Sequence, residues 1–264
     1  MTSTTTADVP QREEFADLDR GVRRLYRAGW VIVGLALFVV GFVLQQLFFT
    51  SWLARANQPE LTAAAELRFA TVEVTEVPYV AEPTPPVAGP GAAEVPSAGD
   101  PIPTVEDPAP REVSLLAEAK PANAEAFAII RVPSLSRLRD GWTVVEGVGT
   151  AELKTGAGHM PDTVLPGMPG NSVISGHRTT YGAPFNQLDE LVAGDIITVE
   201  TAIGVHTYVV REWIIVDPQD VWVTEPRPGA WLTLTTCNPE FSARERLVVF
   251  AELVAGPNWE AIYG

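Results

Sequence analysis

The chain has 264 residues, of which 46% are hydrophobic, and it carries a formal net charge of −15. This length and apolar content are enough for one or two domains with a real core. From Pro121 onward 9 basic residues stand against 17 acidic ones, and no cluster of Lys or Arg could follow a phosphate backbone, so composition argues against a nucleic-acid partner.

An apolar stretch near the N-terminus predicts a membrane-spanning helix. Residues 30–49, WVIVGLALFVVGFVLQQLFF, contain Gln45 and Gln46 as their only polar residues. A helix needs about 20 apolar residues to cross the hydrocarbon core of a membrane. We therefore place the transmembrane helix at residues 29–51.

The charges on either side of this stretch predict its orientation. Only Arg55 lies just after it, whereas four arginines precede it: Arg20, Arg23, Arg24 and Arg27. Basic residues stay on the cytoplasmic side, so residues 1–28 are expected to be a cytoplasmic tail and the chain after residue 51 extracellular. A cleaved signal peptide is the alternative, because residues 54–56 form an A-x-A pattern, but signal peptides have a shorter apolar region of about 7 to 15 residues.

Residues 52–120 are expected to form an extracellular stalk and linker. Residues 57–80 include the sequence PELTAAAELRF, which has moderate helix propensity and no evident packing partner. Residues 81–110 contain nine prolines, five acidic residues and no basic one, a composition that keeps a chain extended. A Pro-rich recognition tract is the weaker interpretation, because such ligands usually have basic flanks.

From about residue 121 the chain changes to short β-branched runs separated by Gly and Pro. Seven strands are predicted, at Ala126–Val132, Thr143–Val148, Ser172–Ser175, Asp195–Glu200, His206–Trp213, Trp231–Thr236 and Leu247–Leu253. Short helical turns are expected at AELKTG and at APFNQLDEL, where Phe185, Leu188 and Leu191 share one face. Seven strands in about 140 residues favour an all-β domain, a closed or nearly closed barrel at residues 121–264.

Cys237 is the only cysteine in the chain. It cannot form a disulfide within the chain, although disulfides persist outside the cell. One interpretation is a buried thiol that packs as a small hydrophobe. The other is a nucleophile, because the run WLTLTTC predicts a half-buried strand that ends at NPEFS and so places the thiol at a strand end.

A nucleophilic cysteine needs a base or cation that favours the thiolate. Of the three histidines, His177 ranks first, because it lies at the end of an apolar strand and the start of a Gly- and Thr-rich loop. His159 ranks second, in the Gly/Pro loop GAGHMP, and His206 ranks last, inside the strand HTYVVREW, where a structural role is expected.

Arg246 follows Cys237 by nine residues and opens the strand RLVVFAEL. If the two strands are antiparallel neighbours, the cysteine and the arginine lie at the same end. A guanidinium there would stabilise an oxyanion or bind a substrate carbonyl. A surface salt bridge with Glu240 or Glu245 is the alternative.

These motifs together resemble those of the sortases, the membrane-anchored cysteine transpeptidases of Gram-positive bacteria. TLTTC matches the family's TLxTC motif, and GNSVISGHR precedes it while the arginine follows. The resemblance covers residues 121–264. The stretches GAGHMPDTVLPGMPGNSVISGHR and TLTTCNPEFSARERLVVF are most similar to class E sortases of high-GC actinobacteria, in keeping with an excess of Arg over Lys.

The resemblance implies a closed eight-stranded β-barrel, one strand more than the pattern predicts. It also implies the catalytic residues, which are Cys237, His177 and Arg246. Arg244 is a near competitor, but the nine-residue spacing favours Arg246. Substrate-binding positions are expected after the catalytic histidine and beside the cysteine, at Tyr181, Thr180 and Thr236. His159 is a further candidate, with a structural or groove-shaping role.

The activity implied is acyl transfer in two halves. Cys237 cleaves a C-terminal LAxTG- or LPxTG-type sorting signal between Thr and Gly, and an amine of a lipid-linked peptidoglycan precursor then takes the acyl group from the thioester. The expected partners are secreted proteins with sorting signals and this precursor, and the expected location is the cell membrane, as a single-pass protein. No cofactor or metal is expected, since acidic loop residues such as Asp217, Asp220 and Glu225 lack the spacing of a Ca²⁺ loop.

Two alternatives stay open at this point. A pilus-polymerising sortase would use a pilin lysine as nucleophile and often carries a lid, and Asp107–Pro108 partly matches a lid motif. A non-catalytic binding module could keep the barrel without the chemistry. Other cysteine enzymes fit less well, because L,D-transpeptidases have SHGC where this chain has Thr235 and Thr236, and papain-like proteases place Cys before His.

Overall fold

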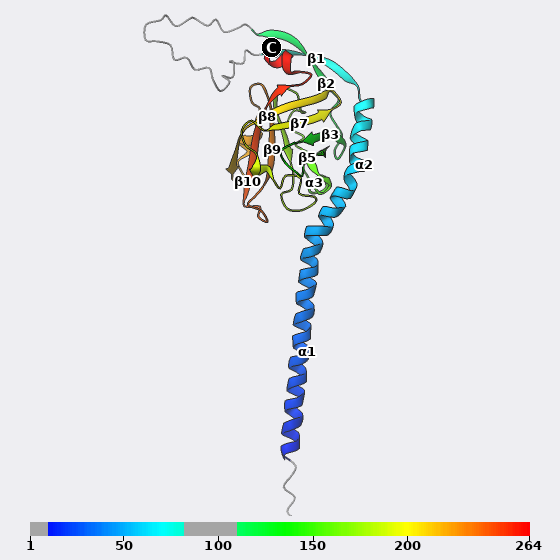
Figure 1. Ribbon diagram of the computed structural model, residues 1–264, viewed down its shortest axis with the longest axis vertical. Helices are drawn as coiled ribbons and strands as arrows, with labels where there is room; N and C mark the ends of the chain where they lie inside the picture. The colour runs from blue at the N-terminus through cyan, green and yellow to red at the C-terminus, as the bar shows by residue number, and fades with distance from the viewer. Residues whose placement is uncertain (1–9, 82–109) are drawn as a thin grey trace, which may run out of the picture. The chain divides into compact units, whose positions relative to one another are not determined.

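The computed structural model describes residues 10–81 and 110–264, without the side chains of residues 10–21, 46 and 47 (Figure 1). The chain divides into two compact units, Met1–Phe49 and Thr50–Gly264. We describe each unit separately. The first nine residues of the predicted cytoplasmic tail and most of the predicted Pro-rich linker lie outside the described residues.

The N-terminal unit is helical. Helix α1 (Pro10–Leu44) is followed by a short π-helical segment, η1 (Gln45–Phe49). Among the described residues, one helical stretch is long and apolar enough to cross a membrane, Val22–Leu44, and none of its apolar window is buried. This stretch overlaps the predicted span but begins earlier in the chain. A helix that exposes apolar side chains on all sides needs an apolar environment around it.

The larger unit is built on a closed eight-stranded barrel with the strand order β10-β8-β7-β3-β4-β5-β6-β9. The strands are β3 (Ala126–Arg131), β4 (Trp142–Glu146), β5 (Ala157–His159), β6 (Gly170–Ser175), β7 (Ile196–Thr201), β8 (Gly204–Val216), β9 (Ala230–Asn238) and β10 (Glu245–Ala255). All seven predicted strands are present, and β5 is the eighth. The expectation of an all-β, closed eight-stranded barrel is confirmed.

Short helices connect the strands. They are α3 (Thr150–Thr155), η2 (Leu188–Glu190), η3 (Val221–Thr224) and α4 (Trp259–Tyr263). The turns predicted at AELKTG and APFNQLDEL correspond to α3 and η2. Phe185, Leu188 and Leu191 are fully buried, as their shared face predicts.

Alternate residues of the strands fill the barrel. On β9, Ala230, Leu232 and Leu234 belong to the central core cluster, together with Phe127 and Tyr208 from other strands. Successive side chains of a strand point to opposite faces, so the intervening residues of β9 face outward. Cys237 belongs to this outward set.

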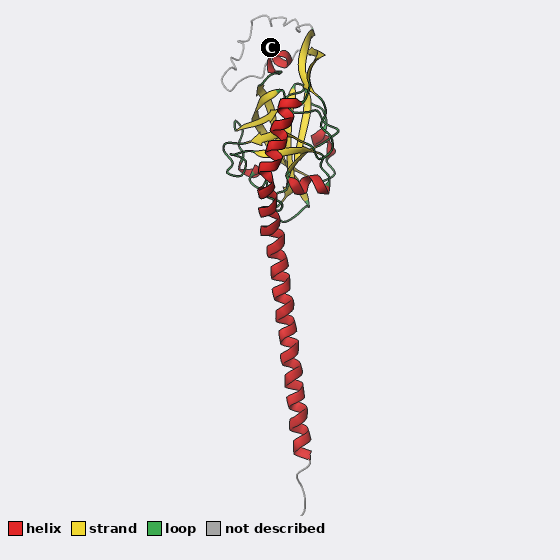
Figure 2. Cartoon of the chain, turned by 90° about the vertical axis from the view of Figure 1, so that its right-hand side faces the viewer, coloured by secondary structure: helices red, strands yellow, loops and turns green. Residues whose placement is uncertain are grey.

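Helix α2 (Thr50–Thr71) packs on the outside of the barrel, and Figure 2 shows it lying across the strands. Ala65 is fully buried in a cluster with Ala126, Ile129 and Val145 of β3 and β4. The expectation that this stretch has no packing partner is therefore wrong. Its small alanine side chains make a weakly apolar face in the sequence, but they let the helix backbone lie close to the sheet.

A two-stranded antiparallel sheet covers another part of the barrel. Strands β1 (Val74–Ala81) and β2 (Arg111–Glu118) pair in register from Val74 opposite Glu118 to Ala81 opposite Arg111. The side chain of Asn258 fastens this sheet to the barrel, because its Oδ1 accepts from the Leu116 N–H and its Nδ2 donates to the Leu116 carbonyl, both at 2.9 Å. The compact unit thus begins at Thr50, whereas the sequence places the start of the domain at residue 121.

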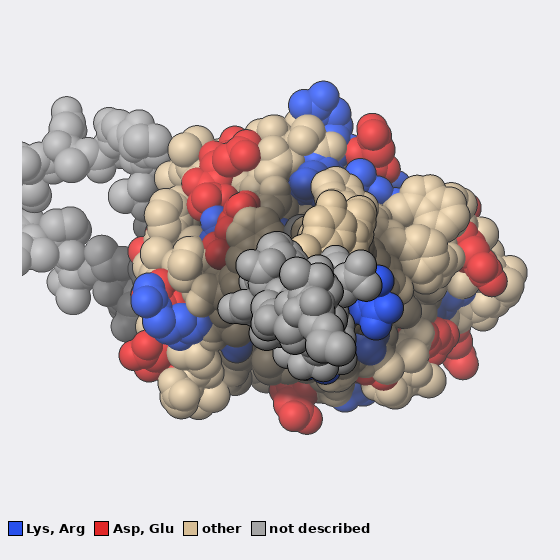
Figure 3. Space-filling model, turned by 90° about the horizontal axis from the view of Figure 1, so that it is seen from below, with Lys and Arg blue, Asp and Glu red and all other residues tan. Residues whose placement is uncertain are grey.

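Charges of both signs are interspersed on the surface. On the face seen in Figure 3, Lys and Arg side chains alternate with Asp and Glu, and they do not form one continuous basic stripe.

Candidate active site

Strands β9 and β10 bring Cys237 and Arg246 together. The two strands are antiparallel, and their register places Cys237 directly opposite Arg246. Directly opposite residues of an antiparallel pair point to the same face, with Cβ atoms about 4.5–5.5 Å apart. The predicted juxtaposition of thiol and guanidinium at one strand end is confirmed.

Cys237 is a free, partly exposed thiol near the end of β9. Its neighbour Thr236 points the other way, is 3% exposed, and donates from Oγ1 to the Gly176 carbonyl at 2.8 Å. Thr236 therefore connects β9 to the end of β6 from inside the barrel, which is a structural role. The core-thiol interpretation of Cys237 does not agree with its outward position and partial exposure.

The parallel pairing of β6 with β9 carries His177 to the same end. Ser175 lies opposite Thr235, and the N–H of Gly176, the residue after β6, donates to the Thr235 carbonyl at 3.1 Å. His177 follows Ser175 by two residues, as Cys237 follows Thr235, so parallel register brings the imidazole and the thiol to neighbouring chain ends. Burial lowers the pKa of the partly buried His177 from its ordinary value of 6.5.

Close packing requires a glycine before this histidine. A Cβ atom at Gly176 would lie 2.7 Å from the ring of Phe185, a distance that real Cβ contacts do not show. The Phe185 N–H also donates to the His177 carbonyl at 3.2 Å. The Gly-His pair of the sequence motif is thus explained by the packing of Phe185 under the loop.

The Arg246 side chain is held by backbone carbonyls. Its Nη1 donates to the carbonyls of Ala243 and Glu245, each at 2.9 Å. Among the described residues Arg246 has no ion-pair partner, and it is Arg244 that approaches Glu245, at 3.7 Å. The salt-bridge alternative for Arg246 therefore does not hold. Its Nη2 makes no hydrogen bond to the described residues and can donate to another group, such as a substrate oxygen.

Arg178, which belongs to none of the predicted sites, connects the loop after His177 to the loop after Cys237. It is 6% exposed, donates from Nη1 to Oδ1 of Asn238 at 2.5 Å, and pairs through Nη2 with Asp189 at 2.8 Å. Asn238 directly follows Cys237, so this arginine fixes the strand ends that carry Cys237 and His177 relative to each other. Its place directly after His177 was the one available sequence signal.

Tyr181 lies beside His177, the first-ranked candidate histidine. Its ring centroid is 5.0 Å from that of His177, with the two rings tilted by 37°. The backbone φ of Tyr181 is +51°, in the left-handed region that large residues rarely adopt. This conformation turns the chain just before Gly182. Thr180 is partly exposed in the same loop, and its carbonyl accepts from Ala183 at 2.9 Å. Both remain candidate substrate contacts.

Comparison with known proteins identifies the family. The model of the Sortase domain family matches residues 130–254. Sortase D of Bacillus subtilis is 32% identical over 143 residues, which cover 52% of this chain and 69% of that protein. The chain belongs to the sortase family.

Class E sortases are among the similar proteins. SrtE1 of Streptomyces coelicolor is 31% identical over 146 residues, so the match spans 49% of this sortase and 41% of the relative. The solved sortase E of Streptomyces avermitilis is 36% identical, with a TM-score of 0.47 and coverage of 53% of this chain and 95% of that one. Sortase E1 of S. coelicolor, solved with a tripeptide in the active site, is 30% identical, with a TM-score of 0.48.

His159, the histidine ranked second by sequence, is a buried structural residue. The sequence places His159 in a loop, but it ends strand β5, and it is fully buried. Its Nδ1 lies 2.7 Å from Oε2 of Glu146, and its Nε2 lies 2.9 Å from the Val164 carbonyl and 3.1 Å from Oγ1 of Thr163. With no exposed surface it cannot touch a peptide, so the substrate-binding role is corrected and the structural role holds.

His206 is also buried and structural. Its Nε2 lies 3.2 Å from Oγ1 of Thr201, while Nδ1 has no partner among the described residues. Burial lowers the pKa of His206 to about 4, because the charged form would lose its hydration. Its ranking behind the other two histidines as a catalytic candidate agrees with this environment.

The acidic loop residues do not gather into a cation site. Oδ2 of Asp220 accepts from the Asp217 N–H at 2.9 Å and so closes a turn. Within the part of the chain that the structure describes, no group of three or more Asp, Glu, His or Cys side chains could hold a metal ion.

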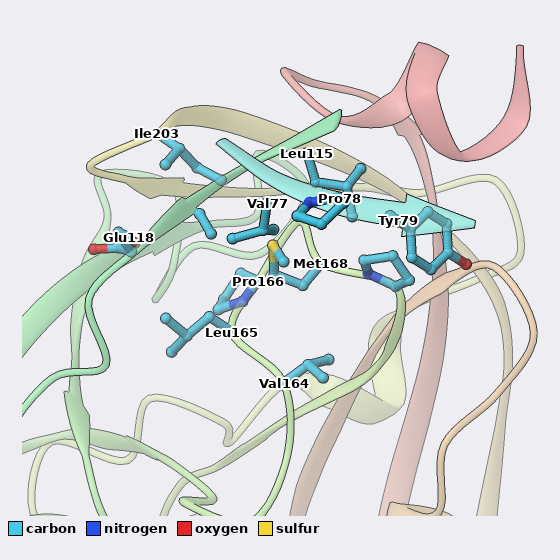
Figure 4. A pocket seen from close by; sticks show the side chains of 12 residues that line it. Val77, Pro78, Tyr79, Leu115, Glu118, Val164, Leu165, Pro166, Met168 and Ile203 are labelled. Atoms are coloured by element: carbon cyan, nitrogen blue, oxygen red, sulfur yellow. The ribbon is translucent and has the colours of Figure 1, made fainter. Parts of the chain in front are cut away.

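A mostly apolar cavity of about 430 Å³ lies under the β1–β2 sheet, with Val77 and Leu115 on the strands and Leu165 and Met168 on the loop before β6 (Figure 4). Glu118 lies at its edge, and burial raises the pKa of this carboxyl, against the opposing effect of Arg68. None of the predicted catalytic residues lines this cavity.

Proposed function

We propose that this sortase is a membrane-anchored cysteine transpeptidase that joins secreted proteins to the cell wall. The observation that carries the proposal is the strand register, which places Arg246 opposite Cys237 and brings His177 to the same end through β6. A nucleophile, a proton carrier and an oxyanion donor are the three groups that acyl transfer from a peptide requires.

In the first half-reaction Cys237 passes its proton to His177 and attacks the carbonyl carbon of Thr in an LAxTG- or LPxTG-type signal. The guanidinium of Arg246 donates to the oxyanion of the tetrahedral intermediate. As the intermediate collapses, the C–N bond to Gly breaks and His177 gives the proton to the leaving amine. The products are a thioester on Cys237 and a free Gly-terminated peptide.

In the second half-reaction an amine of a peptidoglycan precursor attacks the thioester carbonyl. A new C–N bond forms, the C–S bond breaks, and His177 takes the proton that the amine loses. Proton return to the thiolate restores the starting state. The lowered pKa of His177 is compatible with this half, because the neutral imidazole that it favours at neutral pH can accept a proton.

The N-terminal helix supports the membrane location. Val22–Leu44 is apolar and long enough to span a bilayer, and its arginines precede the apolar residues, which favours a cytoplasmic N-terminus. Sorted proteins and a lipid-linked precursor would both be present at this surface. Anchoring the enzyme there raises the effective concentration of both substrates.

The similarity to SrtE1 of Streptomyces coelicolor supports the assignment of a class E-like enzyme. Such an enzyme is expected to prefer LAxTG over LPxTG. The intact Cys, His and Arg positions favour catalysis over a non-catalytic binding module that keeps the barrel.

The test is a transpeptidation assay with the full chain in detergent micelles. Labelled peptides that contain LAxTG or LPxTG are mixed with a small amine, and the ligated product is followed by mass spectrometry. We expect the wild-type protein to form ligated product from both peptides, and more from the LAxTG peptide than from the LPxTG peptide. Cys237→Ala should form none, although its circular dichroism spectrum, and therefore its fold, is unchanged. A folded wild-type protein that ligates neither peptide would contradict the proposal.

A further inference from the structure

A polar cavity of about 680 Å³ lies between helix α2 and the segment that follows the catalytic histidine. Its walls come from α2, from the turn between β3 and β4 together with the first residue of β4, and from Asn186, Gln187 and Glu190 in and before η2. The side chains that matter for its chemistry are Arg55, Gln58, Arg137, Asp140, Asn186 and Glu190. Neither the family motifs nor the proposed catalytic residues account for this cavity.

Two guanidinium groups face this cavity without a carboxylate partner. Arg55 is exposed and, among the described residues, has no hydrogen bond or ion pair. The guanidinium of Arg137 donates to the Gly182 carbonyl at 3.2 Å and forms no ion pair with any described side chain. Burial and the nearby Arg55 lower the pKa of Arg137, while Glu240 raises it. Two unpaired cations that repel each other favour an anion between them.

The position of Arg55 is set by the packing of α2. Gln58, one helical turn further on, accepts from the Thr143 N–H at 3.0 Å and donates to the Thr155 carbonyl at 3.1 Å. Ala54 is 3% exposed and packs near Gly182, where a Cβ atom would lie 3.5 Å from it. Arg55 is therefore carried by a helix that is fastened to the barrel.

The same cavity shares a wall with the catalytic loops. Asn186 donates from Nδ2 to the Arg178 carbonyl at 2.9 Å and to Oε1 of Glu240 at 2.7 Å. Arg178 directly follows His177, and Glu240 lies three residues after Cys237. A group bound in the cavity would thus lie beside the loops that hold the thioester and its proton carrier.

We propose that this cavity is the subsite for a carboxylate of the amine acceptor. The inference rests on the proposed function and names a chemical feature of its second substrate. A carboxylate suits a planar guanidinium fork. Asp140 and Glu190 balance the formal charge of the two arginines, and they would repel a doubly charged phosphate more strongly than a singly charged carboxylate.

Acceptor kinetics test this subsite. Full-chain enzyme in detergent micelles is given Nα-acetyl-lysine or Nα-acetyl-lysinamide, which carry the same ε-amine and differ in the carboxylate. We expect the KM of wild type for the carboxylate acceptor to be roughly tenfold lower, the scale of one charge-assisted hydrogen bond. Arg55→Gln should remove this difference and leave the rate of thioester formation unchanged.

Arg139→Gln is the matched control. Arg139 is exposed on the β3–β4 turn that also carries Arg137, and it donates to the Pro133 carbonyl, but it does not line the cavity. It should keep the preference. Equal KM values for the two acceptors in wild type, or an equal rise for both in Arg55→Gln, would overturn the subsite while transpeptidation itself persists. A wild type that forms no thioester would overturn the proposed function, and the subsite with it.

Discussion

Arg246 and Arg244 lie two residues apart, yet the structure gives them different environments. Arg246 is opposite Cys237 in the β9–β10 register and is braced by two backbone carbonyls. Arg244 is exposed in the connecting loop and approaches Glu245. The nine-residue spacing alone favours Arg246, and the pairing register supplies the physical reason.

Replacing each arginine by lysine tests this distinction. Lysine keeps the charge but cannot make the same two carbonyl contacts while it donates to an oxyanion. We expect Arg246→Lys to lower kcat/KM for a sorting-signal peptide by about 100-fold or more, and Arg244→Lys to change it by less than about twofold. Similar losses in both variants would show that Arg246 has no special position.

His206 predicts a pH dependence of stability. Its folded-state pKa of about 4 lies below its ordinary value of 6.5, so the unfolded chain takes up a proton first as the pH falls. Stability from this residue is therefore present above about pH 6.5 and is lost towards pH 4, by on the order of 3 kcal/mol.

The comparison is made with His206→Gln, which cannot titrate. The free energy of unfolding is measured by chemical denaturation at pH 7 and at pH 4 for both proteins. Wild type should lose more stability between these pH values than the variant. Parallel losses would show that His206 does not cause the acid sensitivity.

The sequence singles out the three proposed catalytic residues because each has a local signal, namely a strand end for Cys237, a Gly- and Thr-rich loop for His177 and a strand start for Arg246. His159 misled because GAGHMP looks like a loop, while its partner Glu146 lies on another strand. Arg178 contacts Asn238 and Asp189, which lie further along the chain, so its place directly after His177 is its one local signal. Arg55 lies on a helix whose packing against the barrel leaves no local pattern in the sequence.

At the scale of elements, the sequence predicts strands where β-branched residues form a run. β5 has only three residues, two of them small, and it pairs in parallel with β4, so neither composition nor a hairpin turn indicates it. β1 contains Pro78, and a proline within an apolar run argues against a strand when only the sequence is read. The packing face of α2 is the hardest to predict, because it contains alanine and so has little apolar periodicity in the sequence.

Arg68 joins α2 to both the small sheet and the barrel. Its guanidinium pairs with Glu118 at 3.0 Å and Glu125 at 3.4 Å, and the side chain of Glu118 is only 2% exposed. Arg68→Met would leave a buried carboxylate without its cation. We expect a loss of about 3–5 kcal/mol in the free energy of unfolding, measured in urea at pH 7.

Arg111→Met is the control, since Arg111 is exposed at the start of β2. It should change stability by less than about 1 kcal/mol. Adding Glu118→Gln to Arg68→Met should restore part of the loss, because the uncompensated charge is gone. If Arg68→Met is no less stable than the control, α2 is not held by this ion pair.

At the scale of the whole chain, the proposed function assigns membrane anchoring to one compact unit and catalysis to the other. The first carries the apolar helix, and the second extends from Thr50 to Gly264 and includes the barrel with α2, β1 and β2. Sequence patterns place the domain start at residue 121, because a barrel's strands are visible in composition and its outer layer is not. The outer layer supplies Arg55 and so a wall of the proposed acceptor subsite.

The central claim is that Cys237 forms a thioester with a sorting signal. Intact mass spectrometry of the full chain in detergent, mixed with an LAxTG peptide and no amine, measures this directly. We predict an added mass equal to the acyl part up to Thr, located on Cys237, removed by hydroxylamine and absent in Cys237→Ala. A folded protein that gains no such mass, or an adduct that persists in Cys237→Ala, would contradict the account.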